Sequence, residues 1–108
     1  MLKEAEDYFN NLPQKIKDKF AIAFFKTKNR YKGDWFEKLN GSDGIFEFRR
    51  RDQTKFYRIF AFWDSEGEEE TLIVGTHGLN KKTNKTPAKE IKKAEAIKKN
   101  YFNSKSKK

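Results

Sequence analysis

The sequence predicts an α+β fold in which an N-terminal helical hairpin and a C-terminal basic helix flank a twisted antiparallel sheet of three or four strands. Three observations predict it. Apolar residues recur at helical spacing as far as residue 28. Aromatic and β-branched residues then dominate residues 45–79, as in strands. A lysine-rich segment that begins at Pro87 returns to helical spacing. The 108 residues suit a single domain over residues 1–102, followed by a disordered basic tail over residues 103–108.

The two N-terminal helices are expected over residues 2–11 and 13–28. Pro13 separates them and suits the first position of a helix, where a missing N–H costs little. Each helix carries an apolar stripe: Leu2, Ala5, Phe9 and Leu12 in the first, and Ile16, Phe20, Ala23, Phe24 and Thr27 in the second. Residues 29–44 contain three glycines and should be irregular, held to the core by Trp35, Phe36 and Leu39.

Three strands are expected over residues 45–50, 55–63 and 71–79, joined as an antiparallel meander. A symmetric turn at Asp52-Gln53 would place Glu47 opposite Arg58 and Arg49 opposite Phe56. Side chains alternate across a strand, so the charged side chains of Glu47, Arg49, Arg51 and Arg58 should share one face, and Phe46, Phe48, Tyr57, Ile59 and Ala61 the other. Phe56, Phe60 and Phe62 remain on the arginine face, either as a second core or as surfaces on which bases stack. The odd length of the next turn leaves the face of His77 open.

The last helix is expected from Pro87 to about residue 102. The net charge of +9 belongs to this end of the chain, because residues 1–79 hold equal numbers of acidic and basic side chains. Such asymmetry indicates a polyanionic partner, although a lysine-rich solvated helix and tail is the alternative. Few bulky apolar residues lie on this helix, so a membrane surface is not the expected partner.

Composition also excludes several classes of protein. No apolar run approaches the ~20 residues of a membrane-spanning helix, and the acidic N-terminal segment lacks the apolar stretch of a signal peptide. A chain without cysteine fits a reducing cytoplasm. A single histidine and no cysteine argue against a zinc site, and no glycine-rich nucleotide loop is present. We therefore expect neither a metal nor a cofactor.

The candidate site residues are cationic or titratable. His77, the only histidine, precedes Lys81, Lys82 and Lys85, and an imidazole beside ammonium groups can move protons and hold a phosphate. Arg49 and Arg51, with Arg58 across the ladder, match the geometry of phosphate oxygens. The structural alternatives are a Glu47–Arg58 salt bridge and a structural histidine at a strand end. The candidate catalytic residues are Arg58, His77 and Lys82, and the candidate RNA-binding residues are Arg49, Arg51, Lys55, Lys81 and Lys85.

The order of these motifs resembles that of the RelE/ParE toxin superfamily, most closely its phage-derived HigB-like branch. The similar segments are Leu12-Pro13, Gly44-Ile45-Phe46-Glu47-Phe48-Arg49, Tyr57-Arg58-Ile59-Phe60, and the strand-to-helix segment from His77 to Pro87, followed by an alanine- and lysine-rich helix. The resemblance covers about residues 5–102. Members usually begin with a β-strand before the helical hairpin, whereas here Met1 directly precedes the first helix.

This resemblance implies the toxin of a type II toxin–antitoxin system, which cleaves mRNA on the ribosome without a metal. It implies a helix-turn-helix antitoxin as partner, with operator DNA contacted only through that antitoxin. Arg58 becomes the best catalytic candidate, and Arg49, His77, Lys81 and Lys82 line the implied RNA surface. Two alternatives stay open: a non-catalytic binder of RNA, ribosome or DNA with salt-sensitive affinity, and a ParE-like gyrase inhibitor. The segment from His77 to Pro87 favours the RNA branch.

Overall fold

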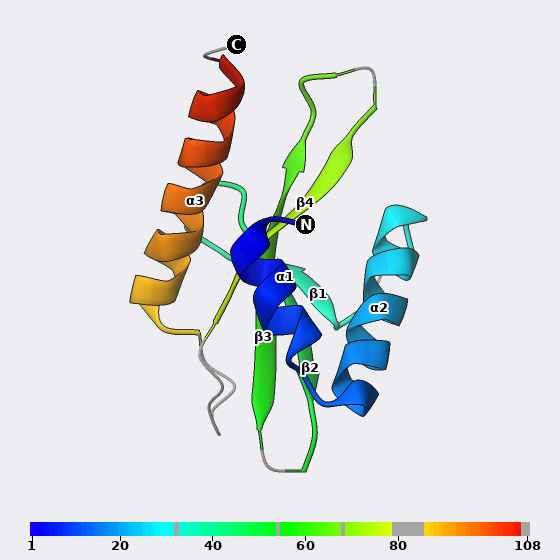
Figure 1. Ribbon diagram of the computed structural model, residues 1–108. Coiled ribbons are helices and arrows are strands. Elements are labelled where there is room, and N and C mark those ends of the chain that lie inside the picture. Colours follow the sequence, from blue (N-terminus) through cyan, green and yellow to red (C-terminus); the bar gives the residue numbers. More distant parts are fainter. Residues whose placement is uncertain (32, 54, 68, 79–85, 107–108) are drawn as a thin grey trace.

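The computed structural model describes residues 1–31, 33–53, 55–67, 69–78 and 86–106. It confirms the α+β fold. Two helices come first, α1 (Lys3–Asn10) and α2 (Gln14–Lys28), and a long helix, α3 (Ala88–Ser106), comes last. Between them lie the strands β1 (Phe36–Lys38), β2 (Phe46–Arg51), β3 (Phe56–Asp64) and β4 (Thr71–His77). They form one antiparallel sheet in the order β1-β2-β3-β4 (Figure 1).

Two segments have a secondary structure that the sequence did not predict. The fourth strand, β1, arises within residues 29–44, which were expected to be irregular, because Phe36 stacks on Phe46 and pairs with Phe48. Helix α3 continues past residue 102 to Ser106, where a disordered tail was expected. The extension is held in place because Phe102 packs against Phe62 and Lys105 Nζ donates a 2.5 Å hydrogen bond to Asp64 Oδ2.

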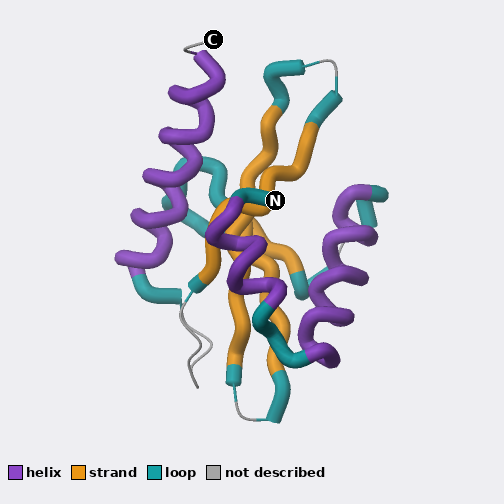
Figure 2. The backbone as a smooth tube through the Cα atoms, viewed as in Figure 1, coloured by secondary structure: helices purple, strands orange, loops and turns teal. Residues whose placement is uncertain are grey.

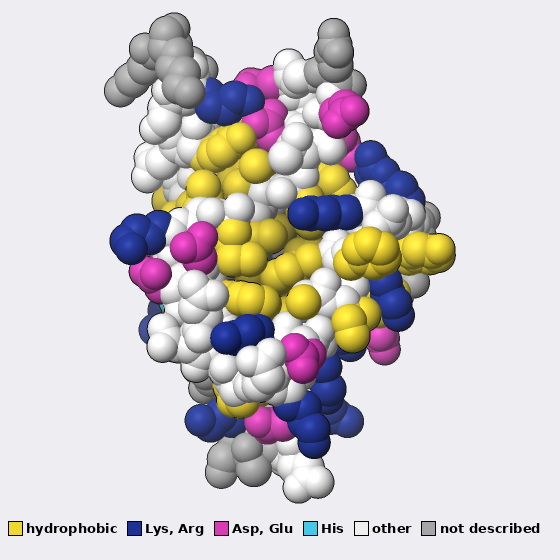
Figure 3. Space-filling view, turned by 45° about the vertical axis from the view of Figure 1, so that its right-hand side comes forward, with side chains coloured by type: hydrophobic (Ala, Val, Ile, Leu, Met, Phe, Trp, Pro, Cys, Tyr) yellow, Lys and Arg dark blue, Asp and Glu magenta, His cyan; other side chains and the backbone are white. Residues whose placement is uncertain are grey.

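The sheet is covered on both faces, with α2 and α3 on opposite sides of it (Figure 2). The face toward α1 and α2 carries the larger core, which includes Phe20, Phe48, Ile59 and Ala61. Hydrophobic side chains of this core reach the surface between α1 and α2, where charged side chains surround them (Figure 3). The face toward α3 carries a smaller core. Its fully buried members are Ile45, Phe60, Phe62 and Ala94.

The predicted faces of β2 and β3 are confirmed, but their register is wrong by two positions. Arg49 lies opposite Arg58, and Arg50 lies opposite Tyr57. The reason is the turn, which closes between Asp52 and Lys55: the Asp52 N–H donates to Lys55 O (3.1 Å), and the Lys55 N–H donates to Asp52 Oδ1 (2.8 Å). A shift of two positions preserves every face, since side chains alternate with a period of two. Phe60 and Phe62 are buried under α3, so they form the second core rather than a stacking surface.

An irregularity in β4 decides where His77 lies. Phe60 pairs with Thr76 and Ala61 with Val74, so Gly75 is the extra residue of a β-bulge. The bulge allows Val74 and His77 to lie on the same face despite their odd separation, and His77 pairs with Ile59 on the α1–α2 face. Glycine fits the bulge because a Cβ there would lie 3.2 Å from Phe62 and 3.6 Å from Ile97.

Candidate functional site

The sheet separates the residues predicted to act together. Arg49 and Arg58 are cross-strand partners on the face toward α3, whereas His77 lies on the face toward α1 and α2. Lys55 lines the same groove as His77, on the opposite face from Arg58. Lys81, Lys82 and Lys85 lie outside the described residues. The structure therefore brings His77 together with Lys55 and not with Arg58.

Arg58 belongs to a buried ion network centred on Glu47. Both side chains are only 1% exposed, and Arg58 Nε lies 3.6 Å from Glu47 Oε2. Arg49 Nε lies 3.4 Å from Glu47 Oε1, and Thr86 Oγ1 donates a 2.5 Å hydrogen bond to Glu47 Oε2. Burial raises the pKa of Glu47, although the Thr86 hydrogen bond and the two guanidinium groups oppose the rise. This geometry corresponds to the structural alternative for Arg58, because a guanidinium this deeply buried does not present a surface to RNA.

Gly78, directly after β4, lies between Arg58 and Glu90 of α3. The Gly78 N–H donates to Arg58 O at 3.1 Å, which continues the β3–β4 pairing by one residue. A Cβ on Gly78 would lie 3.1 Å from the Glu90 carboxylate and 3.2 Å from Arg58 Cβ, so glycine allows the close approach. Glu90 is itself buried. The sequence analysis missed it, although it is one of only two acidic residues within the basic last quarter of the chain.

His77 opens into a groove of about 520 Å³, which we call the His77 groove. The groove is lined by Glu4, Asp7, Tyr8, Asn11, Leu12, Pro13, Lys55, Tyr57 and His77. The Leu2 N–H donates to Val74 O at 2.8 Å and so ties the start of α1 to β4. As a result the imidazole stacks on the Tyr8 ring at 4.2 Å, with the planes 6° apart. Its Nδ1 lies 3.7 Å from Glu4 Oε1, and Glu4 also accepts a hydrogen bond from Lys93.

The protonation states in this groove suit a proton acceptor. Burial lowers the pKa of His77 below its ordinary value of 6.5, and the nearby Glu4 carboxylate opposes this only in part. Partial burial acts to raise the pKa of Glu4, but the hydrogen bond and charge of Lys93 outweigh it, so the pKa is lowered. Burial raises the pKa of Tyr8. At neutral pH the groove therefore holds an uncharged imidazole, an ionised carboxylate and a protonated phenol.

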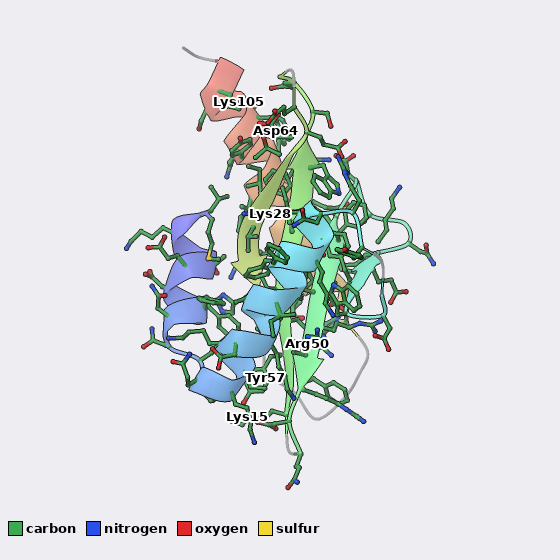
Figure 4. All side chains as sticks on the ribbon, turned by 90° about the vertical axis from the view of Figure 1, so that its right-hand side faces the viewer. Lys15, Lys28, Arg50, Tyr57, Asp64 and Lys105 are labelled. Carbon is green, nitrogen blue, oxygen red and sulfur yellow. The ribbon has the colours of Figure 1, made fainter. Side chains whose placement is uncertain are left out.

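A second groove, of about 560 Å³, lies on the other side of α2 at the edge of the sheet. We call it the arginine groove; it is lined by Lys19, Ile22, Asp34, Trp35, Arg49, Arg50, Arg51 and Phe56. Arg50 from this groove and Tyr57 from the His77 groove are cross-strand partners, and Figure 4 shows them close together beside the N-terminal half of α2. Arg49 and Arg51 thus lie where a ligand could reach them. Phe56, which the sequence offered as a possible stacking surface, lines the same groove, whereas Arg50, Lys19 and Trp35 were not selected from the sequence as site residues.

The sequence model of the phage-derived Gp49-like protein family (DUF891) matches residues 7–99. The chain belongs to this family. The Gp49-like family is associated with RelE-like toxins of toxin–antitoxin systems, which indicates an antitoxin as partner. Comparison with curated proteins and with solved structures gives no match.

The Gp49-like match spans α2, the whole sheet and most of α3, so it includes His77 and every lining residue of the arginine groove. Glu4, which faces His77, precedes the matched region. Among the described residues, no three His, Asp or Glu side chains are grouped so that they could hold a metal ion. Within the same part of the chain, no helix has the length and apolar character needed to cross a membrane.

Proposed function

We propose that this Gp49-like protein is the toxin of a type II toxin–antitoxin system, of the HigB-like branch, and that it cleaves mRNA on the ribosome without a metal ion. The observation that carries the proposal is His77, an uncharged imidazole held between Tyr8 and Glu4 at the wall of an open groove. Membership of a family associated with RelE-like toxins supplies the biological context.

The reaction needs a proton acceptor, a cation and a proton donor. The ribose 2′-OH attacks the adjacent phosphorus, so the O2′–P bond forms while the P–O5′ bond breaks. His77 takes the proton of the 2′-OH. Since its Nδ1 faces Glu4, Nε2 is the nitrogen that would meet the substrate. Lys55, from the same groove, neutralises the charge that develops on the phosphate. The leaving 5′-oxygen is protonated by a second group, for which Lys82 is the candidate.

The remaining cations have positioning or binding roles in this proposal. Arg58 pairs with Glu47, which also accepts the hydroxyl hydrogen bond of Thr86 just before α3, and so helps to hold the start of α3 on the sheet. Arg49 and Arg51 contact RNA outside the His77 groove. Positioning of mRNA by the ribosome supplies much of the rate enhancement, because a correctly oriented 2′-OH is already close to the reacting geometry.

One observation favours a second candidate, a non-catalytic RNA or ribosome binder. Arg58, the expected stabiliser of the transition state, is buried against Glu47 and does not reach the His77 groove. A protein of that kind would stop translation without cutting mRNA, and its affinity would fall steeply with salt.

The deciding experiment is translation of a defined mRNA by purified ribosomes, with primer extension to locate cut sites. The wild-type protein should produce new 5′ ends at a rate that does not change when transition-metal ions are removed or added, with Mg²⁺ kept at the concentration that the ribosomes need. His77→Ala should reduce the cleavage rate by about 10²–10⁴-fold, the range of a general acid or base. Translational arrest without new 5′ ends would support the binder. A parallel supercoiling assay tests the gyrase alternative, which requires inhibition of gyrase and intact mRNA.

A further inference from the structure

The arginine groove exists because β1 is shorter than the strand it pairs with. β1 pairs with β2 only from Phe36↔Phe48 to Lys38↔Phe46, and a final 2.9 Å bond joins the Arg49 N–H to Trp35 O. Beyond that point β2 forms the edge of the sheet. Side chains from both faces of an edge strand can bend toward the open side. Arg49, Arg50 and Arg51 therefore line one groove, although they alternate between faces.

Most of the positive charge in this groove is not neutralised by the protein. Among the cations that line it, Arg49 is neutralised by ion pairs with Glu37 and Glu47. By contrast, Lys19, Arg50 and Arg51 have no carboxylate within ion-pair distance among the residues that the structure describes. Within the described part of the chain, Asp34 is the one acidic side chain that lines the groove. Arg50 Nε also has no hydrogen-bond acceptor within the described part of the chain. That nitrogen is itself buried, so the charges most accessible to an anionic ligand are those of the exposed Lys19 and Arg51 side chains.

Aromatic rings orient the cations. The Arg50 guanidinium lies 5.8 Å from the centre of the Trp35 ring, and the Arg51 guanidinium lies 5.9 Å from that of Phe56. Cation–π contacts of this kind restrict long side chains before a ligand arrives and so reduce the entropic cost of binding. Guanidinium planes and aromatic rings are also the surfaces on which unpaired RNA bases stack.

We propose that the arginine groove is a docking site for the backbone of single-stranded RNA, separate from the His77 groove. The packing of Ile16 and Phe20 of α2 onto the sheet keeps the two grooves apart, while the Arg50–Tyr57 pair makes them neighbours. One RNA strand can therefore be held in the arginine groove while a nearby linkage enters the His77 groove. Unpaired guanidinium groups beside aromatic rings favour RNA over an acidic protein segment, which offers carboxylates but no bases. The identification of this RNA as a substrate rests on the proposed function, whereas the binding of RNA in the arginine groove does not depend on it.

The test uses a fluorescent, short 2′-O-methyl oligouridylate, which cannot be cleaved because it lacks the attacking hydroxyl. The variant Lys19→Gln/Arg50→Gln/Arg51→Gln is compared with Lys89→Gln/Lys92→Gln/Lys99→Gln, a control that removes the same charge from exposed positions of α3. The groove variant should lose at least about tenfold in affinity. Its slope of log affinity against log salt should fall by about two, since each phosphate contact on a single strand contributes ~0.7. The control should lose much less of both.

Three further measurements complete the design. Lys19→Gln/Arg51→Gln spares the partly buried Arg50 and should show the same trend if the triple variant folds poorly. In a Trp63→Phe background, RNA should quench the remaining Trp35 fluorescence. A glutamate-rich peptide at equal concentration should displace only a small part of the probe, and because the probe cannot be cleaved, an absence of mRNA cleavage would not affect any of these results. Any of three outcomes would overturn the proposal. They are equal losses of affinity in the groove variant and the control, Trp35 fluorescence that RNA does not change, and complete displacement of the RNA by a glutamate-rich peptide at equal concentration.

Discussion

Removal of the Arg58 side chain should destabilise the fold much more than removal of its neighbour Arg51. Arg58→Met keeps much of the side-chain volume but leaves the Glu47 carboxylate without its buried partner at 3.6 Å. Breaking a buried ion pair by removing one partner costs about 3–5 kcal/mol. Arg49 at 3.4 Å and the Thr86 hydroxyl still face Glu47, so the lower end, about 3 kcal/mol, is expected. For a domain of this size that corresponds to a fall of roughly 12 °C or more in Tm.

The assay is urea and thermal unfolding followed by circular dichroism, with the cleavage rate measured on the same preparations. Arg51→Met is the matched control, because Arg51, on β2, lies on the same face of the sheet as Arg58 but is exposed. It should change stability by less than about 0.5 kcal/mol. The double variant Glu47→Leu/Arg58→Met should be more stable than the sum of its single variants predicts, since the two groups depend on each other.

The opposite outcome would refute this interpretation of Arg58. If Arg58→Met melts within a degree or two of the wild type and yet loses mRNA cleavage, the guanidinium acts on the substrate and not on Glu47. The buried pair would then have to open when RNA binds, and Arg58 would return to the catalytic role first expected from the sequence.

Three other predictions concern pH and the partner. In a pH–rate profile, the cleavage rate should rise as His77 loses its proton, with a midpoint below 6.5. Glu4→Gln should move that midpoint lower, because it removes the carboxylate that raises the pKa of His77; a midpoint that moves upward would contradict this role of Glu4. The hydrogen bonds from Lys105 and Tyr101 lower the pKa of Asp64 to about 2, so the stability they add is complete above pH 3.8 and is lost as pH falls toward 2. Thermal melts across that range should show the loss in the wild type, and Asp64→Asn should lack it; equal pH dependence in both proteins would assign the acid sensitivity elsewhere. Co-expression with a helix-turn-helix protein from the adjacent gene should relieve growth arrest and give a complex that co-purifies; failure of both would remove the antitoxin proposal.

The amino-acid sequence by itself determined the elements and their faces. The spacing of apolar residues identified both N-terminal helices, and the strict alternation of β2 and β3 assigned Arg49, Arg51 and Arg58 to one face. That assignment survived an error of two positions in the register because alternation has a period of two. The pattern is local, so it can be read without knowledge of the remainder of the chain.

Tertiary structure decided which site residues meet. The bulge at Gly75 turned His77 toward α1, where Glu4 and Tyr8 face it, and this depends on packing against Phe62 and Ile97. The burial of Arg58 depends on Glu47 from the neighbouring strand β2 and on the approach of α3, whose Glu90 lies beside Gly78. The position of the β2–β3 turn was likewise set by the side chain of Asp52, which accepts the Lys55 N–H. Contacts of this kind join residues that are distant in sequence or depend on one side-chain rotamer, and neither composition nor periodicity records them.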